Sequence, residues 1–287
     1  MAVATTLNYE AYDGRDFYPG TSGAITRAWD PVAVNVNNIR GREDDFSLDK
    51  SGFEFHRHTS ACKDWNDKDS VRDVVYEEVI QLLKQRTGAS HVHPCDHLVR
   101  GATYAAGQSF AQTHGQHDRL GFAVPSRMVH VDQSYTGAVQ YLRDNLSATD
   151  ADKLAKTRWA IINIWRPLKP VRRDPFAVCD GSTVPDSDLR EQTAVLTTAN
   201  GKYGDISKGD RFNNWVVKKG EGHRWYYMEH MTPEEVVLIK CFDSKMDGRV
   251  RRAPHSAFVD ERYEGVDEAR ESCEVRCLVF WEGEDVE

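Results

Sequence analysis

Residues 128–134, Met128-Val129-His130-Val131-Asp132-Gln133-Ser134, predict a short strand with two chemically different faces. On an extended backbone alternate side chains point to opposite faces, so His130 and Asp132 share one face and the valines take the other. An imidazole and a carboxylate on one face of a strand supply two of the three ligands of a facial iron site. Because His-x-Asp also occurs by chance, the rest of the chain has to supply a third ligand.

His255 is the candidate third ligand. It lies in the run Arg-Arg-Ala-Pro-His-Ser-Ala-Phe at 251–258, one turn after the apolar run 236–242, and we expect it at the start of a late strand. A jelly roll brings strands that are distant in sequence to one barrel mouth, so the separation from His130 is no obstacle. Iron would need both imidazoles neutral and Asp132 ionised. The alternative interpretation is a strand-end His130 held by Asp132 without any metal.

The order of predicted elements indicates an α+β, mainly β fold, with a β-sandwich or jelly-roll core and flanking helices. Helical spacing predicts a helix over 67–87, with Ser70 as cap and Gly88 at its end, and a second helix over 136–146. A short helix, capped by Thr149, is expected within 149–157. Strands are expected at 32–36, 91–99, 159–166, 192–198, 225–228, 236–242, 254–259 and 273–281, with a hairpin over 46–55. Residues 101–127 and 170–190 are expected to be loops.

We expect residues 1–287 to form a single domain, with residues 1–30 as an extended N-terminal arm. The net charge of -8 and pI of about 5.8 argue against a nucleic-acid surface. No apolar run is long enough to span a bilayer. The six cysteines form no Cys-x-x-Cys pair, which favours a reducing, cytoplasmic location without disulfides or a zinc finger. The oligomeric state is left open.

The last predicted strand offers an anchor for a carboxylate co-substrate. Arg270, Ser272, Glu274 and Arg276 share one face if that strand is regular. A guanidinium can grip the far carboxylate of 2-oxoglutarate with two parallel hydrogen bonds while the keto acid chelates iron. Three candidates stay open: Arg270 with Ser272 beside it, Arg276, and Arg166 in the strand near 163–168. Asn163, on the opposite face from Arg166, is another candidate co-substrate contact.

Other polar residues have simpler explanations. The pairs His56/His58 and His91/His93 lack a consistent set of further metal ligands and are expected to be ordinary surface or core histidines. His114 and His117 are either solvated or part of a cavity wall. For each candidate arginine the competing explanation is a cross-strand salt bridge.

Several separated motifs resemble the fungal hydroxylase/desaturase family, which is related to gibberellin desaturase-like proteins and to a subunit of bacterial cephalosporin methoxylation. The motifs are NIWRPLKPVRRDPFAVCD (163–180), the run 225–258, ESCEVRCLVFWE (271–282), and the earlier Asn-Ile-Arg-Gly (38–41) and Phe-Ser-Leu-Asp (46–49). The resemblance covers roughly residues 30–285. It implies a double-stranded β-helix that uses Fe(II), 2-oxoglutarate and O2 to oxidise a small secondary metabolite, with metal ligands at His130, Asp132 and His255.

Two other functions stay open at this point. A jelly-roll metalloenzyme could use the same triad without a keto acid, and it would need no buried arginine anchor. A non-catalytic partner subunit of a natural-product pathway enzyme would hold no iron. Formation of succinate in step with product distinguishes a 2-oxoglutarate oxygenase from the first alternative. Iron in the purified protein distinguishes it from the second.

Overall fold

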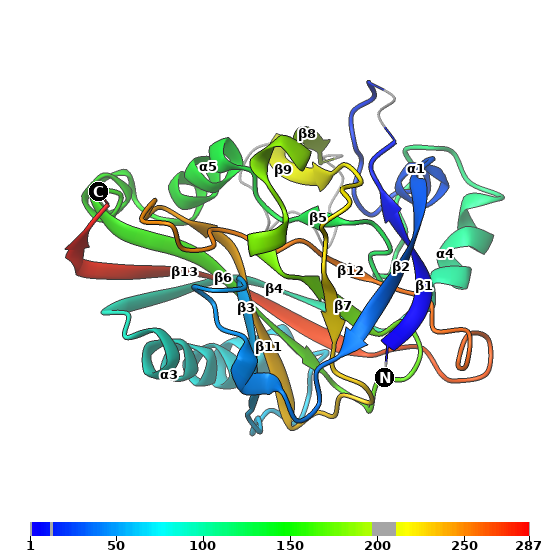
Figure 1. Ribbon diagram of the computed structural model, residues 1–287, viewed down its shortest axis with the longest axis horizontal. Helices are drawn as coiled ribbons and strands as arrows, with labels where there is room; N and C mark the ends of the chain where they lie inside the picture. The colour runs from blue at the N-terminus through cyan, green and yellow to red at the C-terminus, as the bar shows by residue number, and fades with distance from the viewer. Residues whose placement is uncertain (1, 12–13, 197–210, 287) are drawn as a thin grey trace.

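The computed structural model describes residues 2–11, 14–196 and 211–286, and two facing β-sheets form its centre (Figure 1). One sheet has eight strands, in the order β1 (Ala2–Tyr9), β2 (Asp30–Asn38), β10 (Trp225–Tyr227), β7 (Phe176–Cys179), β12 (His255–Ala257), β5 (His130–Val131), β9 (Arg211–Val217) and β8 (Leu189–Val195). The other has five, in the order β3 (Phe53–Arg57), β11 (Glu235–Asp243), β6 (Thr157–Pro167), β13 (Ser272–Asp285) and β4 (His91–Arg100). Neighbouring strands come from distant parts of the chain, as in a double-stranded β-helix.

The space between the two sheets is filled mainly by apolar side chains. Val131 of β5 belongs to one buried cluster with Ile161 of β6 and Leu278 and Phe280 of β13. Strands β6 and β11 lie inside the five-stranded sheet and are buried along nearly their whole length. This explains why their sequences are continuous apolar runs instead of alternating ones. The few polar side chains that point into this space therefore stand out, and they form the site described below.

A helical segment over residues 68–87 covers the outer face of the five-stranded sheet, as Figure 1 shows for α3. It consists of α2 (Lys68–Ser70), a π-helical turn (Val71–Val75) and α3 (Tyr76–Thr87). The predicted helix is confirmed, and Gly88 ends it with a left-handed φ of 68°. The cap is Asp67 and not Ser70, because the Asp67 carboxylate accepts from the backbone N–H groups of residues 69 and 70.

The remaining helices lie at the ends and edges of the sheets: α1 (Ser22–Thr26), α4 (Tyr104–Ala111), α5 (Tyr135–Asn145) and α6 (Ala148–Leu154). Short 3₁₀ turns occur at Glu43–Asp45, Gly181–Thr183 and Asp186–Asp188. The prediction of α5 is confirmed. The α6 helix begins one residue early because Ser147, not Thr149, caps it. Among the described residues no helix has both the length and the apolar character to cross a lipid bilayer.

Several predictions of local structure are wrong. The hairpin over 46–55 does not form, because β3 pairs with β11, far away in sequence, while 46–49 is not a strand. The expected loop 101–127 contains α4, capped by Thr103, and the expected loop 170–190 contains β7. The expected arm contributes β1, which pairs with β2 along its whole length. The strand predicted at 192–198 is β8, whose last residue is Val195; residues 197 and 198 lie outside the described residues.

Strand β4 lies at the edge of its sheet, and Pro94 in its sequence suits that position. Pro94 cannot donate a ladder hydrogen bond, which restricts it to an edge strand. The register between β13 and β4 shifts at this point, between Arg276 opposite Asp96 and Cys277 opposite Pro94. As a result Asp96 is placed directly beside Arg276, with consequences for the site.

Candidate metal centre and adjoining cavities

Two imidazoles from distant parts of the chain face each other across a pair of short strands. His130 of β5 and His255 of β12 are register partners, and their ring centroids are 4.5 Å apart. The Nδ1 atom of His130 lies 2.8 Å from the carbonyl oxygen of Met128, and that of His255 lies 3.2 Å from the carbonyl oxygen of Ala253. A carbonyl only accepts, so each Nδ1 carries the proton and each Nε2 keeps its lone pair for a metal.

Asp132 completes the group immediately after β5. Its Oδ1 atom lies 3.3 Å from Nε2 of His130 and 3.7 Å from Nε2 of His255. Ligand atoms from the three side chains all lie within 4.8 Å of one another, and no second such group occurs in the part of the chain that the structure describes. The structure therefore brings together the three residues that the sequence put forward.

The other oxygen of Asp132 is fully engaged. Oδ2 accepts from Nε of Arg276 at 2.8 Å and from Nδ2 of Asn163 at 2.8 Å. Burial by itself would raise the pKa of Asp132, but the Arg276 guanidinium beside it favours the ionised form and helps to hold that pKa well below its usual range. Two neutral imidazoles and one ionised carboxylate are the donor set that suits Fe(II) with positions left open.

A buried cation lies in a small pocket behind the histidines. Arg270 lines this pocket together with His130, His255 and Glu274, and its guanidinium lies 5.3 Å from the ring centroid of Trp165. One nitrogen of Arg270, Nη1, donates to the carbonyl oxygen of Asp174 at 2.8 Å, while the buried Nε has no partner. Burial lowers the pKa of Arg270 to about 10. A fully buried, incompletely bonded guanidinium is suited to receive a carboxylate.

The other candidate anchors are placed differently. Arg276 is bonded to carboxylates, and Asn163 donates to Asp132, so both contact the metal ligand instead of the pocket of Arg270. Arg166 points to the other face of β6, where Nη1 donates to the carbonyl oxygens of His58 and Pro233. Ser272 is buried at the start of β13, paired in register with Arg100 and Pro167, and does not line the pocket of Arg270.

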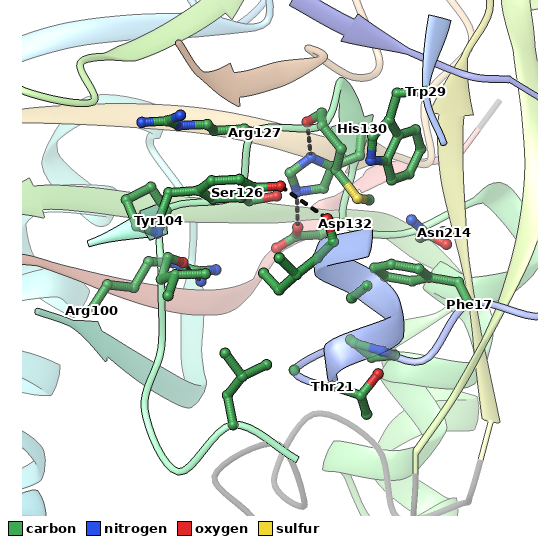
Figure 2. A pocket seen from close by; sticks show the side chains of 18 of the residues that line it. Phe17, Thr21, Trp29, Arg100, Tyr104, Ser126, Arg127, His130, Asp132 and Asn214 are labelled. Atoms are coloured by element: carbon green, nitrogen blue, oxygen red, sulfur yellow. Dashed lines mark hydrogen bonds and ion pairs between the residues drawn. The ribbon is translucent and has the colours of Figure 1, made fainter. Parts of the chain in front are cut away.

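A larger open cavity also borders His130 (Figure 2). It reaches His130 and Asp132 and is walled by aromatic and aliphatic side chains, including those of Phe17, Trp29 and Tyr104. Gln133 and Asn214 add two amides whose side-chain oxygens are buried and have no partner. This lining is typical of a site for a small organic molecule. Only Arg100, Ser126 and His130 line both this cavity and the pocket of Arg270.

Comparisons with known proteins agree with this geometry. A family model described as an oxidoreductase/YMDC permease-like domain matches residues 8–280. The chain is 43% identical to the hydroxylase/desaturase efuI of Hormonema carpetanum, over 99% of this chain and 97% of that protein. The chain belongs to the fungal hydroxylase/desaturase family.

Two further relatives specify the type of enzyme. The alpha-ketoglutarate-dependent dioxygenase phiK of a fungal species is 32% identical over 88% of this chain and 85% of its own. A solved variant of the iron and alpha-ketoglutarate-dependent endoperoxidase NvfI superposes with a TM-score of 0.77 at 25% identity, over 98% of this chain and 99% of its own. The family member described here is accordingly a non-haem iron oxygenase with Fe(II), 2-oxoglutarate and O2 as cofactor and co-substrates. All three relatives are named as enzymes, which favours the catalytic interpretation over a non-catalytic partner.

The remaining histidines are accounted for by local contacts. His56 lies 2.7 Å from Glu54, and His58 contacts Arg166. The ring of His114 stacks on that of Phe110. Sequence reasoning put Asn163 forward as a co-substrate contact and missed its bond to Asp132. It missed Gln133 and Asn214, although the position of Gln133 directly after Asp132 pointed to the site.

Proposed function

We propose that this family member binds Fe(II) through His130, Asp132 and His255 and oxidises a C–H bond of a small, largely apolar natural product. The observation that carries this proposal is the meeting of three metal-compatible ligand atoms between a buried cation and an apolar cavity. When bound, iron supplies the chemistry that activates O2 with 2-oxoglutarate as reductant. The protein's own part is to position 2-oxoglutarate and the substrate.

Arg270 is the proposed anchor for the far carboxylate of 2-oxoglutarate. It is the buried arginine whose pocket is also lined by His130 and His255, and its Nε–H is a hydrogen-bond donor without an acceptor. The Trp165 ring beneath it and the bond to Asp174 fix its position. Arg100 borders the same pocket, so the keto acid dianion enters a region with two cations.

The larger cavity is the proposed substrate site. Its aromatic wall favours a ring-containing apolar body, and the amides of Gln133 and Asn214 favour a polar group on that body. The substrate would approach His130 and Asp132 from this cavity while the keto acid lies in the pocket of Arg270. Hydroxylation and desaturation both remain outcomes of such a placement, because they differ only in which substrate hydrogens face the metal.

Two broader features belong to the same proposal. The chain is proposed to act as a single domain, because β5 and β12 of one sheet hold the ligands while β6 and β13 of the other hold Asp132 in place. A cytoplasmic location is supported by six free cysteines, five of them buried.

The test is anaerobic addition of Fe(II) and 2-oxoglutarate, followed by the weak visible absorption of the iron–keto acid chelate. We expect the wild-type protein to develop the band and His255→Ala to lose it. Arg270→Met should need roughly 10–100 times more 2-oxoglutarate to develop it. The matched control is Arg166→Met, which removes an equally buried guanidinium from the other face of β6 and should leave the titration unchanged.

Absence of the band in folded wild-type protein would contradict the proposal, as would equal effects of the two arginine substitutions. The competing metalloenzyme without a keto acid predicts a metal-loaded protein that oxidises substrate without forming succinate. Succinate produced in proportion to the oxidised product would exclude it.

A further inference from the structure

Asp132 is held from one side only. Both hydrogen bonds to its carboxylate, from Arg276 and from Asn163, end on Oδ2, while Oδ1 faces the two imidazoles. The donors come from the five-stranded sheet, where Arg276 and Asn163 are register partners on β13 and β6. The five-stranded sheet thus binds Oδ2 of Asp132 and leaves Oδ1 next to the two imidazoles.

Arg276 is in turn fixed by three carboxylates. Its Nη1 lies 2.6 Å from Oδ1 of Asp96, its Nη2 lies 3.1 Å from Oε1 of Glu274, and its Nε takes Asp132. Asp96 is the register partner of Arg276 on β4, and its Oδ2 accepts from the hydroxyl of Tyr141 at 2.6 Å. All of these side chains are buried, so the guanidinium can neither rotate nor be replaced by water.

Asn163 is also oriented by two acceptors. The same nitrogen that donates to Asp132 donates to Oε1 of Glu274 at 3.1 Å. Asn163, Arg276 and Asp96 lie side by side on three neighbouring strands, β6, β13 and β4. A ladder of three strands is a rigid support for the two donors that reach the carboxylate.

We infer that Arg276 and Asn163, held by Asp96, Glu274 and Tyr141, restrict Asp132 to binding the metal through one oxygen. This inference rests on the proposed iron centre. A carboxylate that bound through both oxygens would have to give up two charge-assisted bonds in a buried site, which is unfavourable. It would also occupy a further coordination position, and the keto acid with O2 needs all of those that the three protein ligands leave open. Asn163, Asp96, Glu274 and Tyr141 are positioning residues for co-substrate binding, and Arg276, which also borders the larger cavity, positions Asp132 in the same way.

The consequence is specific and can be measured with Mn(II) in place of Fe(II), so that no turnover is needed. Arg276→Lys keeps the charge but loses the planar fork that reaches three carboxylates at once. We expect 2-oxoglutarate to bind the Mn(II)-loaded Arg276→Lys protein roughly 10–100 times more weakly than wild type. Mn(II) binding without 2-oxoglutarate should fall much less, because a released Asp132 can offer both oxygens.

Two milder substitutions keep the test valid if Arg276→Lys does not fold. Asp96→Asn removes the charge that fixes Nη1 of Arg276, and Tyr141→Phe removes only a hydroxyl three contacts away from Asp132. We expect about a tenfold loss of 2-oxoglutarate affinity for the first and a smaller loss for the second. The matched control is Tyr76→Phe, whose hydroxyl bonds Nδ1 of His97 at 3.0 Å on the same strand but leads to no metal ligand.

The outcomes separate this inference from the function on which it rests. Wild-type protein that binds neither Mn(II) nor 2-oxoglutarate would overturn the iron centre itself. Wild-type binding with unchanged keto acid affinity in Asp96→Asn and Tyr141→Phe would overturn the positioning role alone. So would an equal loss of Mn(II) and keto acid affinity, or a loss of the same size in Tyr76→Phe, because a purely structural role predicts either result.

Discussion

At the scale of single residues, Asn214 is the most informative side chain of the larger cavity. It is 3% exposed, and its side-chain oxygen has no hydrogen-bond partner in the described structure. A buried carbonyl without a donor costs about 1–3 kcal/mol of stability. A group that lowers stability and faces a cavity is typical of a ligand-binding position.

We therefore predict that Asn214→Leu raises the free energy of unfolding by up to about 1 kcal/mol, because leucine fills the same volume without an unpaired oxygen. Urea denaturation monitored by tryptophan fluorescence measures the change. Asn8→Leu serves as the control, since its side chain donates to the carbonyl oxygen of Arg127 at 2.6 Å. That substitution should destabilise by about 1 kcal/mol. A destabilised Asn214→Leu protein would show that the amide has a structural partner.

The three proposed metal ligands could be put forward from the sequence, whereas the proposed anchor could not be singled out. His130 and Asp132 could be paired because a strand puts alternate residues on one face. Arg270 and Arg276 follow the same alternation in the sequence, although Arg270 lies two residues before the start of β13, so periodicity cannot distinguish them. The two arginines differ in their neighbours on the adjacent strands. Arg276 lies beside Asp96 on β4 and beside Asn163 on β6. The register between neighbouring strands depends on how the whole sheet assembles, and it cannot be read from a single sequence.

At the scale of elements, the contact between α5 and β9 depends on one glycine. A Cβ atom added at Gly137 would lie 1.9 Å from the carbonyl oxygen of Asn213. That same oxygen accepts from the backbone N–H of Ser134, the residue that caps α5. The helix that follows Asp132 is thus seated directly against β9.

We predict that Gly137→Ala destabilises the protein by several kcal/mol, although alanine favours a helix by about 1 kcal/mol over glycine. The overlap with backbone cannot be relieved by turning a side chain. Thermal unfolding followed by circular dichroism measures the effect. Gly101→Ala, where the nearest neighbour of the added Cβ would lie at 3.7 Å, should change stability little. Equal melting temperatures for both variants would contradict this packing.

The elements that sequence analysis found are those with a long pattern, and those it missed are short or locally ambiguous. The β6 and β11 strands are long continuous apolar runs, and the α3 helix carries apolar residues at helical spacing. In contrast, β7 has only four residues, too few to show a pattern. The α4 helix was hidden because it contains Gly107, which is needed there since a Cβ would lie 3.2–3.3 Å from Ile25, Leu120 and Val124.

At the scale of the whole molecule, the proposed iron site connects the two sheets. The ligands belong to the eight-stranded sheet and the donors that hold Asp132 to the five-stranded one. Ligand that binds only the folded state stabilises it by about 2.7 kcal/mol at a concentration of 100 Kd. We predict a rise in melting temperature with Mn(II) and a further rise with 2-oxoglutarate, both absent in His255→Ala. Differential scanning calorimetry measures them; identical shifts in His255→Ala would place the bound metal elsewhere.

A second feature of the whole molecule is its acid sensitivity. Asp243 is completely buried, 2.9 Å from Nζ of Lys240 and 3.0 Å from Nη2 of Arg158. Burial alone would raise the pKa of Asp243, but Lys240 and Arg158 together lower it. A carboxyl whose pKa is lower in the folded state contributes stability above its unfolded pKa and loses it as the pH falls through the folded value.

We predict that the free energy of unfolding is level above about pH 5 and falls progressively below about pH 4. Asp243→Asn should flatten part of this slope and lower the stability at neutral pH by up to about 3–5 kcal/mol. Lys240 and Arg158 then lose their buried partner and keep only the more exposed carboxylates of Asp49 and Glu284. Urea unfolding at a series of pH values measures both effects. A slope that is unchanged in Asp243→Asn would assign the acid sensitivity to other carboxyl groups.

The three proposed ligands differ in their access to water, and this difference has a kinetic consequence. The His255 side chain is 3% exposed, whereas those of His130 and Asp132 are each 12% exposed and border the larger cavity. An ion that enters or leaves must pass through the same mouth as the organic molecule that is to be oxidised. A molecule bound in the cavity blocks this route. Chelators should therefore remove the metal quickly from protein with an empty cavity and slowly from protein whose cavity is occupied.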